Sequence, residues 1–170
     1  MSKNTVKNEG ALSADTRKIL NDNTSDVSVA SATFSATSGD TSTTLTNVAG
    51  LVTGTLEAGT YRFMIHLAGV ATANSGLKVG LKQGTASMLT SIESIARGFT
   101  ASAVAVQHST TATDAASLFA STSAVINCII EGTVVVATAG TLQVQAAQNA
   151  SHADTTSVYL GSYMTFTKVV

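Results

Sequence analysis

The sequence predicts an all-β protein, an antiparallel β-sandwich or jelly roll that follows an extended N-terminal arm. In many short segments apolar and polar residues alternate with a period of two, which is typical of strands with one buried face. Turn signals containing glycine separate these segments at fairly regular spacing, as in sandwiches and jelly rolls. Charged residues make up only 11% of the chain, against about 25% in an ordinary soluble protein. Their place is taken by 20 Ser, 27 Thr and 26 Ala. Leu, Ile, Val and Phe total 41 residues, which is above the level of a disordered chain and indicates a folded domain with small side chains.

The charged residues are concentrated at the N-terminus. Residues 1–26 carry eight of the 19 charged residues, and the remaining 144 residues carry 11. This change in composition predicts an arm over residues 1–26 and a jelly-roll β-sandwich over residues 27–170. Within the arm, Ser13 could cap a short helix. The apolar face of that helix would be formed by Leu12, Ile19 and Leu20.

The clearest strand of the domain is expected from Thr60 to Ala68. Its odd-numbered residues from Tyr61 to Leu67 are large and apolar, whereas Arg62, Met64 and His66 occupy the opposite face. Further strands are expected within residues 27–34, 77–82, 104–106, 125–130, 133–136, 142–146 and 158–169.

For two segments the sequence does not decide the secondary structure. Met88, Ile92, Ile95 and Phe99 match the spacing of a helical stripe, but the same stretch also alternates like a strand. Residues 114–120 could form one helical turn within a loop.

The edges of the expected sheets lack their usual protection against association. Pro and charged side chains normally keep an edge strand from pairing with another chain. This chain contains no Pro and few charged residues. We therefore expect the edges or faces of the domain to be covered in a homo-oligomer.

Catalysis has little support in the sequence. His66, His108 and His152 are far apart and lack metal-ligand spacing, so surface or interface roles are favoured over a metal trio. Ser-His-Asp sets built on His108 with Asp114, or on His152 with Asp154, are expected by chance among 20 serines. We therefore expect no enzyme activity, no metal site and no cofactor.

Other classes of function are also disfavoured. No Lys or Arg occurs between Gly98 and Thr167, whereas nucleic-acid binding needs a basic stripe. No apolar run approaches the length of about 20 residues that crosses a bilayer, and no signal-peptide pattern is visible. Cys128 lies in an apolar run and is expected to be a buried, inert thiol. We expect a protein made in the cytoplasm that binds neither nucleic acid nor membrane.

Three segments resemble structural proteins of tailed bacteriophages. Residues 41–63 read TSTTLTNVAGLVTGTLEAGTYRF, residues 129–149 read IIEGTVVVATAGTLQVQAAQN, and residues 158–166 read VYLGSYMTF. Their order is also similar to that in jelly rolls of the tumour necrosis factor and complement globular-head type, which are commonly trimers. The segment from Asn74 to Ser123 shows little of either pattern, so no loop function is carried over from these families.

The resemblance implies a virion protein that binds the outside of a phage capsid and stabilises it, a decoration or cement protein. Its partners would be the major capsid protein and further copies of itself, with a trimer implied, and its location would be the capsid surface after synthesis in the bacterial cytoplasm. The alternative is a head or tail fibre module that recognises a host receptor or a carbohydrate. The lack of Trp and the three Tyr disfavour a sugar-stacking site.

Two groups of contact residues are expected. In the arm, the residues expected to contact the capsid are Val6, Leu12, Arg17, Lys18, Ile19 and Leu20. In the domain, Tyr159, Tyr163 and Phe166 are candidates for the subunit interface, because interfaces are enriched in aromatic residues. An interpretation in which these three side chains fill the core of the sandwich is equally open.

Overall fold

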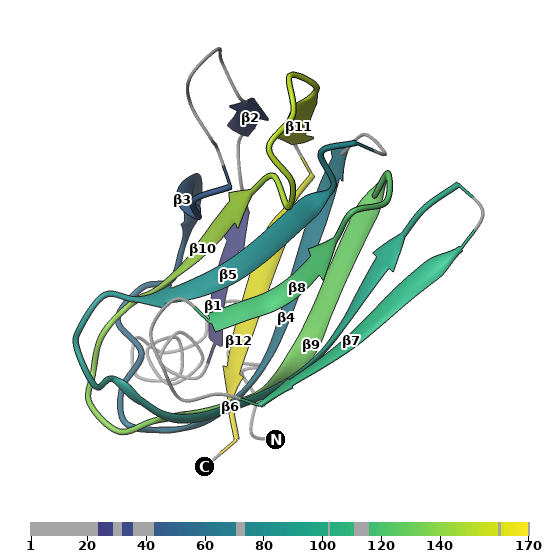
Figure 1. Ribbon diagram of the computed structural model, residues 1–170. Helices are drawn as coiled ribbons and strands as arrows, with labels where there is room; N and C mark the ends of the chain where they lie inside the picture. Colours follow the sequence, from purple (N-terminus) through teal and green to yellow (C-terminus); the bar gives the residue numbers. More distant parts are fainter. Residues whose placement is uncertain are drawn as a thin grey trace, which may run out of the picture.

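The protein is a sandwich of two antiparallel sheets (Figure 1). The computed structural model describes residues 24–28, 32–35, 43–70, 74–101, 103–110, 116–159 and 161–169. These residues form 12 strands and no helix, so the predicted fold class is confirmed. The large sheet contains β1 (Thr24–Ser28), β2 (Ala32–Ser35), β4 (Gly59–Val70), β6 (Leu89–Phe99), β7 (Val104–Thr110), β9 (Asn127–Val136), β11 (Thr155–Val158) and β12 (Tyr163–Lys168). The small sheet contains β3 (Thr46–Val52), β5 (Leu77–Gln83), β8 (Ala116–Ser121) and β10 (Leu142–Ala147).

The chain crosses between the two sheets at most of its connections. The large sheet has the order β1-β12-β4-β9-β6-β7, with β11 paired to β4 and to β2, and the small sheet has the order β3-β10-β5-β8. Strands that are consecutive in the sequence, such as β3, β4 and β5, therefore lie in alternate sheets. This is the connectivity of a jelly roll.

Residues 89–99, whose pattern allowed a helix or a strand, form the strand β6. β6 places Ile92 and Ala96 in the core, whereas Ile95 is 41% exposed. A helix would have placed Ile92 and Ile95 on one face, so the pairing of β6 with β9 and β7 decides between the two patterns. The helical turn considered near residue 114 is wrong for its described part, which begins β8 at Ala116.

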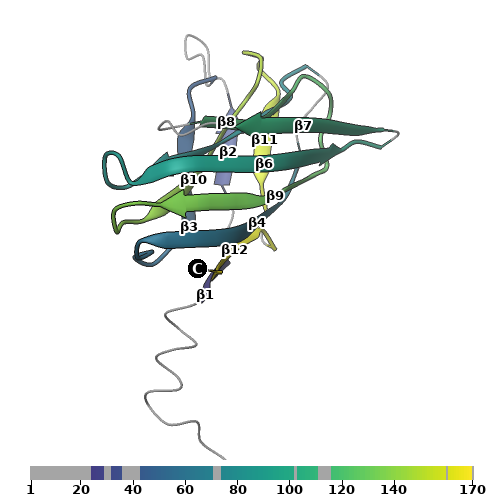
Figure 2. The same cartoon turned by 90° about the horizontal axis from the view of Figure 1, so that it is seen from below.

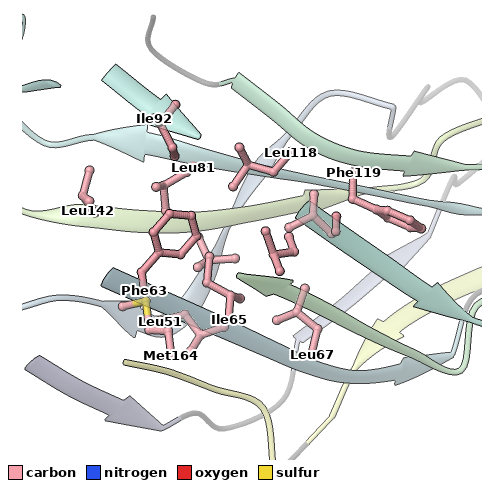
Figure 3. Packing of buried hydrophobic residues seen from close by; sticks show 14 of the residues in the cluster. Leu51, Phe63, Ile65, Leu67, Leu81, Ile92, Leu118, Phe119, Leu142 and Met164 are labelled. Carbon is pink, nitrogen blue, oxygen red and sulfur yellow. The ribbon is translucent and has the colours of Figure 1, made fainter. Parts of the chain in front are cut away.

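The core lies between the two sheets and consists mainly of aliphatic side chains with a few aromatic rings. Figure 3 shows ten of its labelled members pointing into this layer: Leu51, Phe63, Ile65, Leu67, Leu81, Ile92, Leu118, Phe119, Leu142 and Met164. The prediction for residues 60–68 is confirmed, because Tyr61, Phe63, Ile65 and Leu67 are all buried.

Close packing of the sheets requires a glycine opposite one of these rings. A Cβ atom added at Gly98 in β6 would lie 2.2 Å from the ring of Phe119 in β8. Only a residue without a side chain lets the ring pack directly on the β6 backbone.

The hairpin formed by β6 and β7 ends beyond the other strands of the sandwich (Figure 2). Among the described strands, β7 pairs with β6 alone and is an edge strand of the large sheet. The Ala120 N–H of β8 donates a hydrogen bond to Gln107 Oε1 of β7, with a length of 2.6 Å. This side chain links the neighbouring edges of the two sheets.

At the N-terminus, residues 1–23 of the expected arm lie outside the described residues. Residues 24–26 belong to β1, which pairs with β12 along its whole length.

Candidate functional site

The outward side of the large sheet forms an ordered array of side chains. The register of β12, β4, β9, β6 and β7 aligns these side chains in three rows that cross the five strands, with β9 in the middle. We call this array the outer face. Its first row is Thr167, Arg62, Thr133, Glu93 and Thr110, its second Thr165, Met64, Glu131, Ile95 and His108, and its third Tyr163, His66, Ile129, Arg97 and Val106.

Apolar side chains lie at solvent-accessible positions of the outer face. Ile95 is 41% exposed and Val106 is 63% exposed, and Met64, Ile129 and Tyr163 are half-buried. Within the part of the chain that the structure describes, no strand packs over these side chains. In the second and third rows these apolar side chains alternate with polar ones such as Glu131 and Arg97, a mixture that is also found in interfaces between proteins.

The charges of the outer face are balanced. Arg97 Nη1 lies 2.8 Å from Glu131 Oε2, and both side chains are about half exposed. Arg62 and Glu93 are exposed and form no ion pair with any described residue. The face therefore carries two arginines and two glutamates, of which one pair is already neutralised within the chain.

An aromatic pair lies at the β12 side of the face. The rings of His66 and Tyr163 have centroids 5.2 Å apart and are inclined by 33°. His66 Nδ1 is shielded from solvent and has no hydrogen-bond partner among the described residues.

Shallow depressions rather than a deep cleft mark the outer face. One open depression of about 620 Å³ is lined by Arg62, Met64, Ile95 and Glu131 together with threonines of β9 and β12. A smaller one of about 220 Å³ adjoins it and reaches His108. The lining of the larger depression combines hydroxyl groups, one arginine, one glutamate, a thioether and aliphatic groups. This mixture suits contact with a broad surface more than enclosure of a small substrate.

The three aromatic interface candidates fall in different places. Phe166 is fully buried and stacks on Phe63, with ring centroids 5.4 Å apart, so the core interpretation holds for Phe166. Tyr163 belongs to the outer face, and Tyr159 is 47% exposed just after β11. Tyr159 and Tyr163 remain accessible to a partner.

The arm residues expected to contact a capsid are Val6, Leu12, Arg17, Lys18, Ile19 and Leu20. All six lie outside the described residues, and their role stays a prediction.

Sequence reasoning missed the apolar positions of β6 and β7 that face outward. Ile95 was left open between a helical stripe and a strand. Val106 was assigned to a strand, but no prediction was made of which side of the strand it occupies. Consistent use of the period of two over residues 89–99 would have separated Ile95 from Ile92 and Ala96.

The remaining polar groups considered for chemistry are dispersed. His152 Nδ1 lies 3.2 Å from Asp154 Oδ2, and the same carboxylate oxygen accepts a hydrogen bond of 3.0 Å from Asn74 Nδ2. These contacts fix a loop at the surface. In the described ranges no group of three or more His, Cys, Asp or Glu residues is close enough to hold a metal ion, and Asp114 lies outside those ranges.

Cys128 lies in the core, as predicted. Burial raises the pKa of its thiol to about 12. The nucleophilic thiolate is therefore scarce at neutral pH.

Membrane-spanning helices are not found in the part of the chain that the structure describes. Comparison with known protein families and with curated proteins found no match to this chain.

Proposed function

We propose that the protein is a non-enzymatic virion component that binds the outside of a phage capsid as a homo-oligomer and stabilises the shell. The observation that best supports an assembly role is the outer face, on which Ile95 and Val106 are exposed beside a balanced set of charges. The capsid as partner rests on the resemblance of residues 41–63 and 129–149 to phage structural proteins.

A decoration protein needs no reactive group, because its effect comes from mass action. A protein that binds the assembled shell and not the free subunits shifts the equilibrium toward the shell. Several weak contacts from one symmetric oligomer add up through avidity, provided that all can be made at once. The oligomer implied by the resemblance is a trimer. We assign the arm to contacts with the capsid, and Tyr159 and the outer face offer surfaces for contacts between copies of the chain.

Cosedimentation with expanded, undecorated capsids tests this function. We expect the purified full-length protein to sediment with the capsids and to raise their resistance to heat. Deletion of residues 1–22, which leaves β1 intact, is expected to abolish capsid binding and to leave a soluble oligomer. The full-length double variant Ile19→Ser/Leu20→Ser is expected to weaken binding in the same direction.

Lys82→Glu is a suitable control, because Lys82 is exposed on the small sheet. It belongs neither to the arm nor to the outer face, and it is not next to Tyr159 in the sequence. It should bind capsids like the unmodified protein. If the variant that lacks residues 1–22 binds normally, the proposed role of the arm is wrong. Cosedimentation with host cells but not with capsids would contradict decoration and support the fibre module that recognises a receptor or a carbohydrate.

A further inference from the structure

The two charges of the outer face without an ion pair are placed symmetrically about β9. Arg62 in β4 and Glu93 in β6 both lie opposite Thr133 of β9, one on each side. Each is exposed and neither pairs with a described residue. We propose that the outer face binds the outer face of a second copy of this chain, about a two-fold axis that runs along β9.

Such an axis exchanges the strands on the two sides of β9. β6 of the second copy then lies over β4, and β7 of the second copy lies over β12. In the first row, Arg62 faces Glu93 of the second copy, and Glu93 faces Arg62 of the second copy. A two-fold interface makes every such contact twice, so one unpaired arginine and one unpaired glutamate per chain form two ion pairs.

The other two rows combine polar and apolar matches. Thr165 faces His108 of the second copy, and His66 faces Arg97 of the second copy, which stays bound to its own Glu131. Ile95 of the second copy lies over Met64, and Val106 of the second copy lies over Tyr163. On the axis itself, Ile129 packs against its own symmetry mate. The half-exposed apolar side chains are thus covered by one another, and the charge of the combined surface is zero.

The crossing angle of packed sheets leaves the pairing of Arg62 with Glu93 intact. Sheets in aligned sandwiches pack about 10 Å apart and cross at about 30°. With strands about 4.8 Å apart, this angle displaces side chains on β4 and β6 by about 2.5 Å, which is within the reach of an arginine. Side chains on β7 and β12 are displaced by about 5 Å, about the spacing of one strand.

The area is sufficient for association. Five strands about 4.8 Å apart and roughly nine residues of 3.3 Å each define a patch of about 24 by 30 Å. Two such patches bury roughly 1,400 Å², which is within the range of about 1,200–2,000 Å² for specific interfaces.

The axis also brings Glu131 close to its own symmetry mate. Two carboxylates in this position would repel each other if they were free. Each Glu131, however, is already bound by Arg97 of its own chain at 2.8 Å. The groups that meet on the axis are therefore neutral ion pairs.

The proposal concerns the free protein and does not depend on binding to a capsid. It also differs from the trimer that the resemblance implies, because a two-fold contact joins chains in pairs. Measurement of the mass of the purified full-length protein therefore tests it without the capsid experiment.

A charge-exchange experiment identifies the contact. Sedimentation equilibrium over a concentration series measures the association of the full-length protein, of Arg62→Glu, of Glu93→Arg, of the double variant and of an equimolar mixture of the two single variants. Each single variant alone places like charges opposite each other twice. We expect roughly a tenfold or greater increase in the dissociation constant of each.

The mixture and the double variant should restore association to within about threefold of the unmodified protein. In a mixed pair, the carboxylate introduced at position 62 faces the guanidinium introduced at position 93, and the natural Glu93 of one chain faces the natural Arg62 of the other. Absence of association by the unmodified protein would overturn the proposal. So would single variants that associate normally, or a mixture that is not restored. A ring of three chains cannot alternate two variants, so a trimer built on this contact would fail the mixing test.

The apolar part of the contact is tested separately with matched variants. Ile95→Asp should weaken association by at least tenfold. Val52→Asp is the control, because Val52 is 39% exposed, close to the 41% of Ile95, but lies in the small sheet opposite Gln143. Equal weakening by both variants would contradict an interface confined to the outer face.

Discussion

The two sheets of the sandwich differ in the side chains that point away from the core. On the small sheet these side chains include Lys78, Lys82, Gln143 and Gln145. Gln143 Nε2 donates to Val48 O and Gln145 Nε2 donates to Asn47 Oδ1, both at 2.9 Å. On the outer face of the large sheet, the apolar side chains of Ile95 and Val106 are exposed among polar neighbours. Arg62 and Glu93, which carry opposite charges, have no ion-pair partner among the described residues.

The outward sides of the two sheets therefore differ in the kinds of side chain that they expose. Amide side chains that bond to their own sheet have used part of their hydrogen-bonding capacity, and the lysines beside them are readily hydrated. The outer face instead combines exposed apolar area, whose burial is favourable, with unpaired charges of both signs, which are stabilised when a partner supplies the opposite charge. The small sheet is suited to solvent, and the large sheet is suited to a partner.

The largest expected effect separates the inward and outward sides of β12. Phe166→Ala removes a fully buried ring that stacks on Phe63, and it should lower the free energy of unfolding by about 3–5 kcal/mol. Tyr163→Ala removes a half-buried ring on the outer face and should cost about 1 kcal/mol. Urea unfolding followed by circular dichroism measures both. Equal losses would mean that the outer face contributes to the fold as much as the core does.

A smaller effect is expected at Gly132 of β9, where the backbone of β6 leaves no room for a side chain. A Cβ atom added at Gly132 would lie 2.0 Å from the carbonyl oxygen of Glu93. Gly132→Ala should therefore separate β6 from β9 and lower the free energy of unfolding by about 1–3 kcal/mol.

Gly54→Ala is the matched control for this substitution, because no atom lies within 4 Å of the position of its Cβ. Its effect should stay within about 0.5 kcal/mol. If Gly132→Ala is equally mild, the close approach of β6 and β9 does not restrict the outer face.

The smallest effect is expected for the ion pair of the outer face. Arg97→Gln removes the partner of Glu131, and both side chains are about half exposed. Thermal unfolding at low salt should show a loss of no more than about 1 kcal/mol, because exposed ion pairs are screened by solvent. A loss of several kcal/mol would indicate that this pair stabilises the fold itself.

The sequence predicted the architecture well where the alternation was long. Residues 60–68 were assigned both a strand and a buried face, and both are confirmed in β4. The prediction was ambiguous for residues 88–99, because apolar residues at positions 88, 92, 95 and 99 have the spacing of a helix, whereas the residues at positions 89, 91, 93 and 95 can be read as one face of a strand. Pairing with β7 and with β9 resolves it, and the β9 partners lie 28 to 47 positions further along the chain.

The candidate site was predicted less well than the fold. Aromatic content alone placed Tyr163 and Phe166 together as interface candidates, although they point to opposite sides of one strand. Residues three positions apart in a strand lie on opposite faces, so the position of β12 in the sheet separates the accessible ring from the buried one.

By itself, the sequence determined the β class, the burial of one face of the clearest strand and the sparse charge of the domain, because these depend on local alternation and composition. Only the tertiary structure decided which strands are neighbours. The placement of Arg62 and Glu93 on the two sides of Thr133 requires β4, β9 and β6 to pair in one register. An alternating pattern specifies which side of a strand is buried, but not which strand lies beside it. The outer face is therefore a property of long-range pairing.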